Sequence, residues 1–426
     1  MSQKLAVLVA RAGKEERLTN VIGFVDVELL RLAFESLRRE AAAGIDGQTW
    51  ADYGANLEGN LQEVYQRLRS GRYRAPTIRR VMIPKEHGGS RALGITTVED
   101  RLVQKAVAWV LSAVYEHDFL DCSHGFRPGR SAHGALHQLH RAAEERGVRA
   151  VVEVDIQGYF DQVNRDWLRR FLRHRVNDGG LLRLIGKWLQ AGVLDQGVVT
   201  RTADGVPQGG PISPILANVY LHYVLDLWFE HRFKRHCRGY AQLIRYADDF
   251  VALFGNPADA ERFRREVEAR LAAFGLQVAP EKTAVVPFDG SRNDPCGPSA
   301  GSFTFLGFVH FVGRTRHGRR TVKRKPSGKA RERFLQRIQA WLTSNRHLPV
   351  RLHQVYLSRA LRGYYQYFGI RDSADALSTV QYRTQRLWQR ALQRRSQKAK
   401  RTTDWETLRR QSWFQLPPPR MTQRWV

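Results

Sequence analysis

The 426-residue chain carries 69 Lys and Arg against 41 Asp and Glu, which gives a formal net charge of +28. A surface with this excess repels itself unless an anionic partner covers it, so nucleic acid is the first partner to expect. An anionic membrane is the competing partner, but no apolar run approaches the roughly 20 residues that a spanning helix needs.

The length allows two to four domains, and a hydrophobic content of 42% fits a folded protein. The three cysteines, Cys122, Cys237 and Cys296, lie far apart and form no CxxC pair. This spacing disfavours a zinc knuckle and a disulfide framework, and it suits a reducing cytosol.

Residues 1–70 predict short helices, which would form either a nucleic-acid clamp or a packing layer. Residues 78–85 and 91–95 then predict two strands joined by a glycine turn. Lys85 and Arg91 flank this turn and are candidates for binding a triphosphate, since a guanidinium makes bidentate hydrogen bonds to phosphate oxygens. A solvated basic hairpin is the alternative.

An amphipathic helix is predicted over 98–115, and a basic loop over 123–131 leads into another helix over 132–146. Arg127 and Arg130 in this loop are candidates for holding a template backbone. A plain structural turn is the equal alternative.

Residues 150–155 predict a strand that ends on the carboxylate of Asp155. A loop over 206–214 launches a further helix, and its glycines let the backbone approach a ligand closely. Residues 275–283 and 303–311 predict further strand segments.

Asp248 and Asp249 lie between two apolar runs within 243–254, which predicts a tight hairpin with both carboxylates at its tip. An isolated pair of this kind is usually an ordinary acidic turn. Like charges held this close repel unless a cation lies between them, and Mg²⁺ prefers carboxylate and phosphate oxygens. With Asp155 as a third carboxylate, the set suits a two-metal site, with two Mg²⁺ ions or Mn²⁺ in their place. Primer extension and nuclease hydrolysis both use such a site, but only extension needs a triphosphate grip.

From Arg314 the chain becomes strongly basic, with eleven Lys and Arg and a single acid in residues 314–337. Three helices are predicted, over 327–342, 350–368 and 374–397. Basic faces interleaved with aromatic residues favour phosphate contact over a merely solvated surface. The candidate nucleic-acid-binding residues here are Arg324, Lys325, Arg331, Arg362, Arg390 and Arg394.

Tyr246-Ala247-Asp248-Asp249 resembles the YxDD box of reverse transcriptases. The order of the surrounding motifs is similar to that of group II intron-encoded reverse transcriptase/maturases, over about residues 20–420, and several boxes in fixed order are more specific than one. The other matching motifs are 83–85 (Ile-Pro-Lys), 91–95 (Arg-Ala-Leu-Gly-Ile), 123–131 (Ser-His-Gly-Phe-Arg-Pro-Gly-Arg-Ser), 155–161 (Asp-Ile-Gln-Gly-Tyr-Phe-Asp), 207–214 (Pro-Gln-Gly-Gly-Pro-Ile-Ser-Pro), 281–283 (Glu-Lys-Thr), 305–308 (Phe-Leu-Gly-Phe) and 361–368 (Leu-Arg-Gly-Tyr-Tyr-Gln-Tyr-Phe).

The resemblance implies an α+β right-hand polymerase, with an antiparallel sheet and packed helices in the fingers and palm, followed by an α-helical thumb. The implied domains are an N-terminal RNA-binding and fingers extension over 1–75, fingers and palm over 76–312, a helical thumb/maturase domain over 313–400 and a C-terminal tail over 401–426.

On the matching positions, the resemblance implies metal ligation by Asp155, Asp248 and the carbonyl of Ile156, with Asp249 as the third acid. Phe160 matches the ring that would exclude a ribose 2′-hydroxyl. The remaining nucleotide-binding candidates are Lys85, Arg91, Gln208 and Lys282.

The implied activity is that of an RNA-directed DNA polymerase, which extends a DNA primer on an RNA template with deoxynucleoside triphosphates. It would also bind intron RNA and a DNA target, and assist group II intron splicing and retrohoming.

The expected location is the bacterial cytoplasm, associated with the nucleoid and without membrane attachment. No endonuclease-type tail follows the thumb, so such a protein would borrow its primers. Two alternatives stay open: a domesticated relative serving host defence, repair or CRISPR spacer acquisition, and an RNA-binding splicing cofactor with dispensable polymerase activity.

Overall fold

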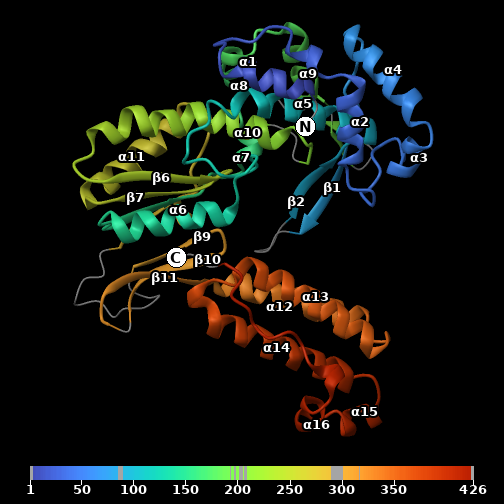
Figure 1. Ribbon diagram of the computed structural model, residues 1–426, viewed down its shortest axis with the longest axis vertical. Helices are drawn as coiled ribbons and strands as arrows, with labels where there is room; N and C mark the ends of the chain where they lie inside the picture. The colour runs from blue at the N-terminus through green and yellow to red at the C-terminus, as the bar shows by residue number, and fades with distance from the viewer. Residues whose placement is uncertain are drawn as a thin grey trace. The chain divides into compact units, whose positions relative to one another are not determined.

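The computed structural model combines helices with antiparallel pairs of strands, which confirms the α+β class (Figure 1). It describes residues 3–84, 90–191, 193–195, 198–200, 205, 209–288, 301–315 and 317–423. The chain forms two compact units. Unit 1 comprises Met1–Leu139 and Val152–Val285, and unit 2 comprises His140–Val151 and Val286–Val426.

Unit 1 begins with a helical layer built around α5 (Val98–Tyr115), against which α1 (Gln3–Ala12) and α2 (Val27–Glu35) pack. The side chain of Thr97 caps α5 by accepting a hydrogen bond from the backbone N–H of Asp100. The remaining helices up to residue 190 are α3 (Trp50–Gly54), α4 (Leu57–Arg69), α6 (Ala132–Glu145), α7 (Tyr159–Gln162), α8 (Arg165–Arg175) and α9 (Gly179–Leu189).

One sheet of unit 1 has the strand order β2-β1-β4-β5. The two strands predicted before α5 are confirmed as β1 (Ile78–Pro84) and β2 (Ser90–Ile95), which pair antiparallel. Two short strands extend this sheet, since β4 (Val193–Asp195) pairs parallel to β1 and antiparallel to β5 (Val198–Thr200).

A second sheet has the order β6-β7-β3-β8, of which Figure 1 labels β6 and β7. Its strands are β6 (Ala241–Tyr246), β7 (Asp249–Phe254), β3 (Ala150–Val154) and β8 (Ala284–Pro287). Helix α11 (Pro257–Ala272) packs against β7, and α10 (Ser213–Leu221) packs against α8 and α5. Beyond α10 the helix continues as π-helical turns, first at His222–Asp226 and again at Phe229–Phe233.

The strand predicted over 275–283 is wrong. This segment makes one isolated bridge, between Ile156 and Val278, and then a 3-10 turn at Pro280–Lys282. Pro280 has no backbone N–H to give to a ladder, so the strand starts only at Ala284.

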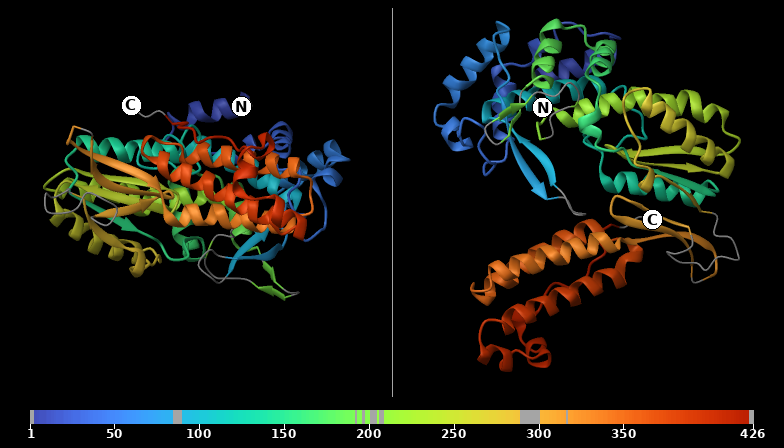
Figure 2. Two further views of the ribbon diagram at one scale, coloured as in Figure 1. Left: turned by 90° about the horizontal axis from the view of Figure 1, so that it is seen from below. Right: turned by 180° about the vertical axis from the view of Figure 1, so that it is seen from behind.

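Unit 2 contains a three-stranded antiparallel sheet with the order β11-β10-β9 (Figure 2). The single strand predicted over 303–311 is a hairpin of β9 (Ser302–Phe305) and β10 (Phe308–Arg314), because Leu306 and Gly307 both take positive φ and reverse the chain. The strand β11 (Arg320–Pro326) was not predicted. Its inward positions alternate, but Arg324 fills one of them and hides the apolar pattern.

The three helices predicted for the C-terminal part are confirmed as α12 (Gly328–Ser344), α13 (Val350–Phe368) and α14 (Ala374–Gln393). They share a core with Trp388 at its centre, and Phe414 from beyond α14 stacks on this ring at 4.7 Å. None of the helices in the described part of the chain combines the length and apolar character that crossing a bilayer requires. Two short helices follow α14, namely α15 (Gln397–Thr402) and α16 (Trp405–Arg409).

A short segment from the N-terminal half of the chain, His140–Val151, belongs to unit 2. Arg320 of β11 donates hydrogen bonds to the carbonyls of Ala143 and Val148, and Thr321 donates to the carboxylate of Glu144 at 2.7 Å. The sheet of unit 2 is therefore completed by residues that precede β3.

Asp100 provides a test of the packing around α5. Its carboxyl is 1% exposed and accepts hydrogen bonds from Tyr73 Oη at 2.8 Å, Trp188 Nε1 at 2.7 Å and Gln104 Nε2 at 2.8 Å. Burial raises the pKa of Asp100 to about 6. The protonated carboxyl is thus favoured by folding, and its contribution to stability is lost as the pH rises from about 4 through about 6.

We expect Asp100→Asn to flatten the dependence of the unfolding free energy on pH over this interval, by about 3 kcal/mol for the full shift. Denaturant unfolding at a series of pH values measures this slope. A slope that is the same in the wild type and in the variant would show that other groups titrate there.

Candidate active site

The acidic hairpin is present, with its turn displaced by one residue from the prediction. Tyr246 pairs with Asp249, so the two-residue turn consists of Ala247 and Asp248, and Asp249 already begins β7. Asp248 is half-buried and Asp249 is exposed. The two carboxylates therefore stand at one end of the β6–β7 pair, one in the turn and one on the strand.

The turn places Ala247 at φ +58°, a left-handed conformation that favours glycine. Such a residue costs about 1–3 kcal/mol and persists where its surroundings hold it. One support is the start of the basic loop, because His124 N donates to Arg245 O at 2.8 Å and Arg245 N donates to Cys122 O at 2.7 Å. A Cβ on Gly125 would lie 2.4 Å from Ala247 N, so only glycine allows this segment to back the turn.

The second support is a buried polar network centred on Arg245, whose side chain is 0% exposed. Its guanidinium donates to Asp226 Oδ1 at 2.8 Å, Asn218 Oδ1 at 3.0 Å and Ser123 Oγ at 2.8 Å. The same group donates to the carbonyl of Ala247 at 2.9 Å and so holds the turn directly. Asp226, also 0% exposed, supplies the compensating charge from the first π-helical segment.

Asp155 directly follows β3, the strand next to β7. Its carbonyl accepts a hydrogen bond from Ala279 N at 2.8 Å, and Ile156 lies opposite Val278 as an isolated bridge. In this antiparallel pairing the bonds are made by the neighbours of Ile156, so its own carbonyl points away from Val278. The carbonyl oxygen of Ile156 is therefore not used in the pairing with Val278.

The carboxylate of Asp155 already attracts a cation, since Lys282 Nζ lies 2.5 Å from its Oδ2. This hydrogen bond raises the pKa of Lys282. Within the described residues, no three His, Cys, Asp or Glu side chains are grouped as a ready metal site. The donor chemistry of Asp155, Asp248 and Asp249 nonetheless fits a hard divalent cation, which would compete with the lysine for Asp155.

The segment after Asp155 lies near the acidic turn. Tyr159 is 2% exposed and donates its hydroxyl to Ala217 O at 2.7 Å. Burial raises the pKa of Tyr159, and the charge of Asp248 raises it further. Phe160 is half-buried, and a Cβ on Gly205 would lie 3.2 Å from its carbonyl, so Gly205 lies close to the backbone of Phe160.

Two nucleotide-binding candidates, Lys85 and Gln208, lie outside the described residues. Arg91 is placed through its backbone in β2. Gly209 has φ +111°, and a Cβ there would lie 2.3 Å from Gly94 O. The loop that follows Gln208 therefore approaches the strand that carries Arg91.

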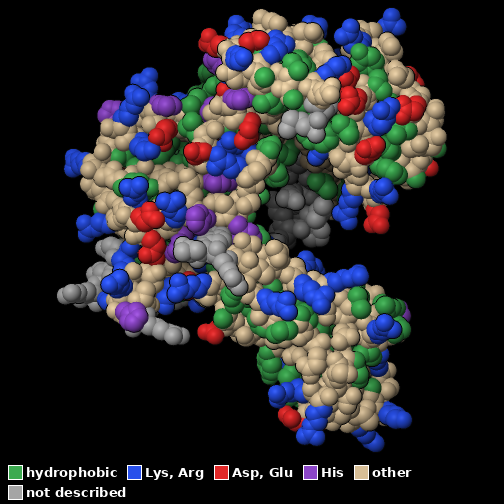
Figure 3. All heavy atoms as spheres, in the orientation of Figure 1, with side chains coloured by type: hydrophobic (Ala, Val, Ile, Leu, Met, Phe, Trp, Pro, Cys, Tyr) green, Lys and Arg blue, Asp and Glu red, His purple; other side chains and the backbone are tan. Residues whose placement is uncertain are grey.

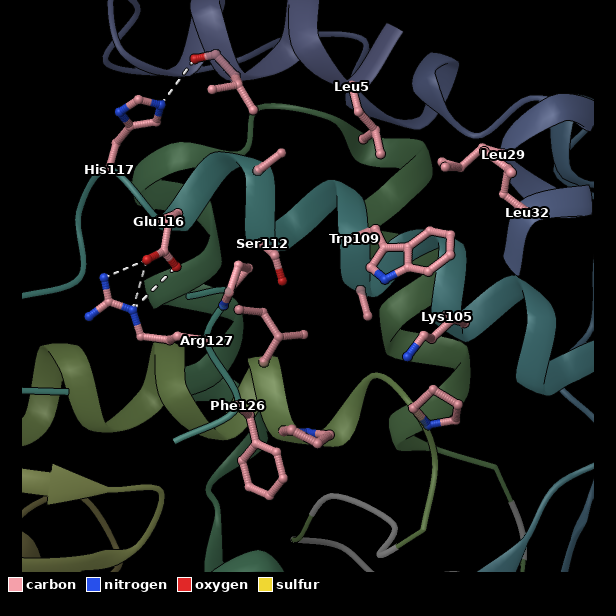
Figure 4. A pocket seen from close by; sticks show the side chains of 17 residues that line it. Leu5, Leu29, Leu32, Lys105, Trp109, Ser112, Glu116, His117, Phe126 and Arg127 are labelled. Atoms are coloured by element: carbon pink, nitrogen blue, oxygen red, sulfur yellow. Dashed lines mark hydrogen bonds and ion pairs between the residues drawn. The ribbon is translucent and has the colours of Figure 1, made fainter. Parts of the chain in front are cut away.

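The guanidinium of Arg127 binds groups of the protein itself. This residue is 7% exposed, and all five of its N–H groups donate to the carboxylate of Glu116 or to the carbonyls of Phe119, Leu120 and Ser123. Figure 4 shows its ion pair with Glu116 at one side of an apolar pocket of about 870 Å³ in unit 1. This burial contradicts the template-binding role predicted for Arg127 and favours the structural alternative.

The other predicted nucleic-acid-binding residues differ in exposure. Arg130 pairs with the exposed carboxylate of Asp121 at 2.6 Å, and the ammonium of Lys325 lies 5.6 Å from the centre of the Phe311 ring. In Figure 3, Lys and Arg side chains gather over α12 and α13. Of the remaining candidates, Arg362, Arg390 and Arg394 are exposed, Arg331 is half-buried and Arg324 is buried.

Arg245 and Asp226 were not among the predicted site residues. Each is a lone charge within an apolar run, and such a charge is rarely buried without a partner, so this pattern could have identified both. Arg346 was not predicted either, although it lines a small hollow between α12 and α14 together with Arg390 and Arg394.

An acidic turn held by a buried network, next to a strand that ends before another aspartate, fits a nucleotidyl-transfer class of protein within an α+β fold. Residues 83–310 match the family model described as "Reverse transcriptase (RNA-dependent DNA polymerase)". The chain therefore belongs to the reverse transcriptase family.

The chain is also similar to curated proteins, one of which is named as a group II intron-encoded protein. It is 35% identical to Protein YkfC of Escherichia coli (strain K12) over 320 residues, which cover 68% of this chain and 81% of YkfC. It is 37% identical to the Group II intron-encoded protein LtrA of Lactococcus lactis subsp. cremoris over 205 residues, 47% of this chain and 34% of LtrA. A third relative, the uncharacterized 91 kDa protein in cob intron of Schizosaccharomyces pombe, is 39% identical over 171 residues, 40% of this chain and 21% of the relative.

Proposed function

We propose that this chain extends a DNA primer along an RNA template with deoxynucleoside triphosphates. The observation that carries the proposal is the Ala247-Asp248 turn, which the fully buried Arg245 holds at the end of the strand pair beside Asp155. A polymerase needs such fixed carboxylates because phosphoryl transfer depends on positioning and on electrostatic stabilisation.

Divalent cations, Mg²⁺ or Mn²⁺, would be held by Asp155, Asp248 and the carbonyl of Ile156, with Asp249 as the third acid. When bound, two such ions lower the pKa of the attacking hydroxyl and neutralise charge on the leaving phosphate. The part of the protein itself is to hold the carboxylates in place. Adjacent strands carry them, and the buried network fixes the turn against the repulsion of its own charges.

The proposed architecture is a right hand. An N-terminal RNA-binding extension over 1–75 leads into fingers and palm over 76–312, which carry the acidic turn. The helices α12, α13 and α14 within 313–400 form the thumb, and residues 401–426 form the tail. The basic side chains on the thumb helices supply the contacts to nucleic-acid phosphates that such a part needs.

The incoming nucleotide would lie between Phe160 and the strand that carries Arg91. Phe160 would block a ribose 2′-hydroxyl, and the proximity of Gly209 to Gly94 supports a pocket shared by β2 and the loop of Gln208. Lys85 and Lys282 complete the proposed pocket as cations for the triphosphate.

A second candidate function is assistance to group II intron splicing, with intron RNA bound by the thumb. The similarity to LtrA favours it, as do the exposed Arg362, Arg390 and Arg394. A basic protein with these partners would act at the bacterial nucleoid. Splicing that survives Asp248→Asn but fails after Arg390→Ser/Arg394→Ser would separate this function from DNA synthesis.

The purified chain should convert an end-labelled DNA primer on an RNA template into longer DNA when Mg²⁺ and deoxynucleotides are present, and chelation of the metal should stop the reaction. In the same assay, Phe160→Ala should incorporate ribonucleotides that the wild type rejects. A shortened primer or template would instead indicate a nuclease. Unchanged discrimination by Phe160→Ala would remove the role assigned to that ring.

A further inference from the structure

A second site of binding is suggested by a hollow of about 1190 Å³ in unit 2, beside the edge strand β11. Five basic side chains line it, and Asp372 is the one acid among its described lining residues. The basic residues come from the end of β10, the turn after it, β11 itself and the 3-10 turn before α14. They are Arg314, Arg319, Lys323, Arg324 and Arg371.

The charge of this hollow is poorly balanced from within. Glu144 is near Arg324, but its carboxylate already accepts hydrogen bonds from Thr321 Oγ1 and the backbone N–H of Val322. His310, directly opposite Arg324 in the β10–β11 pair, is fully buried, and burial lowers its pKa to about 3, so it is neutral. Several like charges gathered around one space repel one another, and a bound anion would relieve this repulsion.

Arg324 shows that part of the hollow is built into the fold. It is 4% exposed, and burial lowers its pKa to about 10. Burying a guanidinium is unfavourable unless partners offset the lost hydration, and the negative charges of Asp372 and Glu144 offset part of it for Arg324. The neighbouring Arg320 donates to backbone carbonyls and has a structural role. The basic residues of this strand are therefore divided between holding the sheet together and facing the hollow.

The size and lining of the hollow indicate the chemistry of its ligand. Its volume exceeds that of a typical small-molecule pocket of about 300–1,000 Å³, so a single phosphate would not fill it. Guanidinium groups bind phosphate oxygens in pairs. Phe, Tyr and Trp are absent from its described lining residues, and His140 and His317 supply the aromatic rings there, so the lining offers mainly charge to phosphates.

We propose that this hollow, the β11 hollow, binds the sugar-phosphate backbone of a nucleic-acid strand without reading its sequence. None of its lining residues is a candidate metal ligand, so the proposal concerns strand binding and does not depend on the catalytic role of the aspartates.

The test uses the full chain and three triple variants. Arg314, Arg319 and Arg371 are exposed, so changing all three to Ser should leave the fold intact. The same positions changed to Lys keep the charge. A matched control removes three exposed arginines of the C-terminal tail, outside the thumb helices, as Arg401→Ser/Arg409→Ser/Arg410→Ser. Binding of labelled single-stranded RNA and DNA is measured over a range of salt concentrations, with inorganic tripolyphosphate as competitor.

For the Ser variant we expect an affinity at least about tenfold weaker, and a slope of log K against log salt that is smaller by about 2, since three phosphate contacts are lost. The Lys variant should stay near the wild type, and the control should change clearly less. DNA synthesis per bound complex should be unchanged at saturating template, which separates this site from the polymerase activity.

Equal losses in the Ser variant and in the control would overturn the proposal, because the effect would then be one of net charge alone. A Ser variant that loses tripolyphosphate binding but keeps oligonucleotide binding would also overturn it, and would identify a polyphosphate site instead.

Discussion

Replacing Asp248 with Asn is expected to slow primer extension by at least about 10³-fold, equivalent to about 4 kcal/mol of transition-state stabilisation. Asn keeps the size of the side chain and suits a turn, so the fold should survive, while the charge that would hold a divalent cation is lost. The measurement is the rate of DNA synthesis at saturating primer and template, together with the dissociation constant of the template.

Template binding should be no weaker in this variant, because the carboxylate repels phosphates and contributes nothing to holding them. Asp375→Asn is the matched control, since it removes an exposed acid in the first turn of α14, far along the chain from the site. If Asp248→Asn synthesises DNA at the wild-type rate, the carboxylates of the turn are not catalytic and the polymerase assignment of this site fails.

Replacing Arg245 with Met should destabilise the protein by about 3–5 kcal/mol, because Asp226 would be left as a buried charge without its partner. Activity should be lost as well, since the Ala247 carbonyl loses the donor that holds the acidic turn. The unfolding free energy from denaturant titration and the rate of primer extension are the two readouts.

A double variant, Arg245→Met/Asp226→Leu, separates the two effects. Replacing both members of a buried ion pair with apolar residues often restores stability, so most of the lost unfolding free energy should return. DNA synthesis should stay impaired, because no group then holds the turn. Recovery of both properties in the double variant would show that Arg245 acts only through stability and does not position the aspartates.

The sequence was sufficient to predict those elements whose apolar residues recur at a regular spacing. The helices α12, α13 and α14 and the pair β1–β2 follow from such spacing, and the acidic turn follows from two apolar runs around Asp248 and Asp249. The carboxylates of the site could be named because each stands at the end of a predicted strand.

What supports the site could not be predicted, because the contacts join distant positions. Arg245 reaches Asp226 across 19 residues and Ser123 across 122 residues, and a local pattern gives no information on such pairs. Arg127 illustrates the same limit, because here a local pattern predicted a surface role for a residue that its contacts in the fold bury. A basic loop in a basic protein predicts a surface contact, but the carboxylate of Glu116 and nearby carbonyls bind the whole guanidinium. Similarly, β11 was missed because its inward Arg324 breaks the apolar alternation.

The membership of His140–Val151 in unit 2 has a consequence for protein engineering. A fragment that ends after Val285 would retain these residues but lose Arg320 and Thr321, which bind their backbone and the carboxylate of Glu144. A chimaera that takes only its C-terminal part from a relative would likewise pack the β11 of that relative against the native segment His140–Val151. An exchange of unit 2 therefore has to move two separate stretches together, His140–Val151 and Val286–Val426. The first of these stretches contains the start of β3, the strand that leads to Asp155.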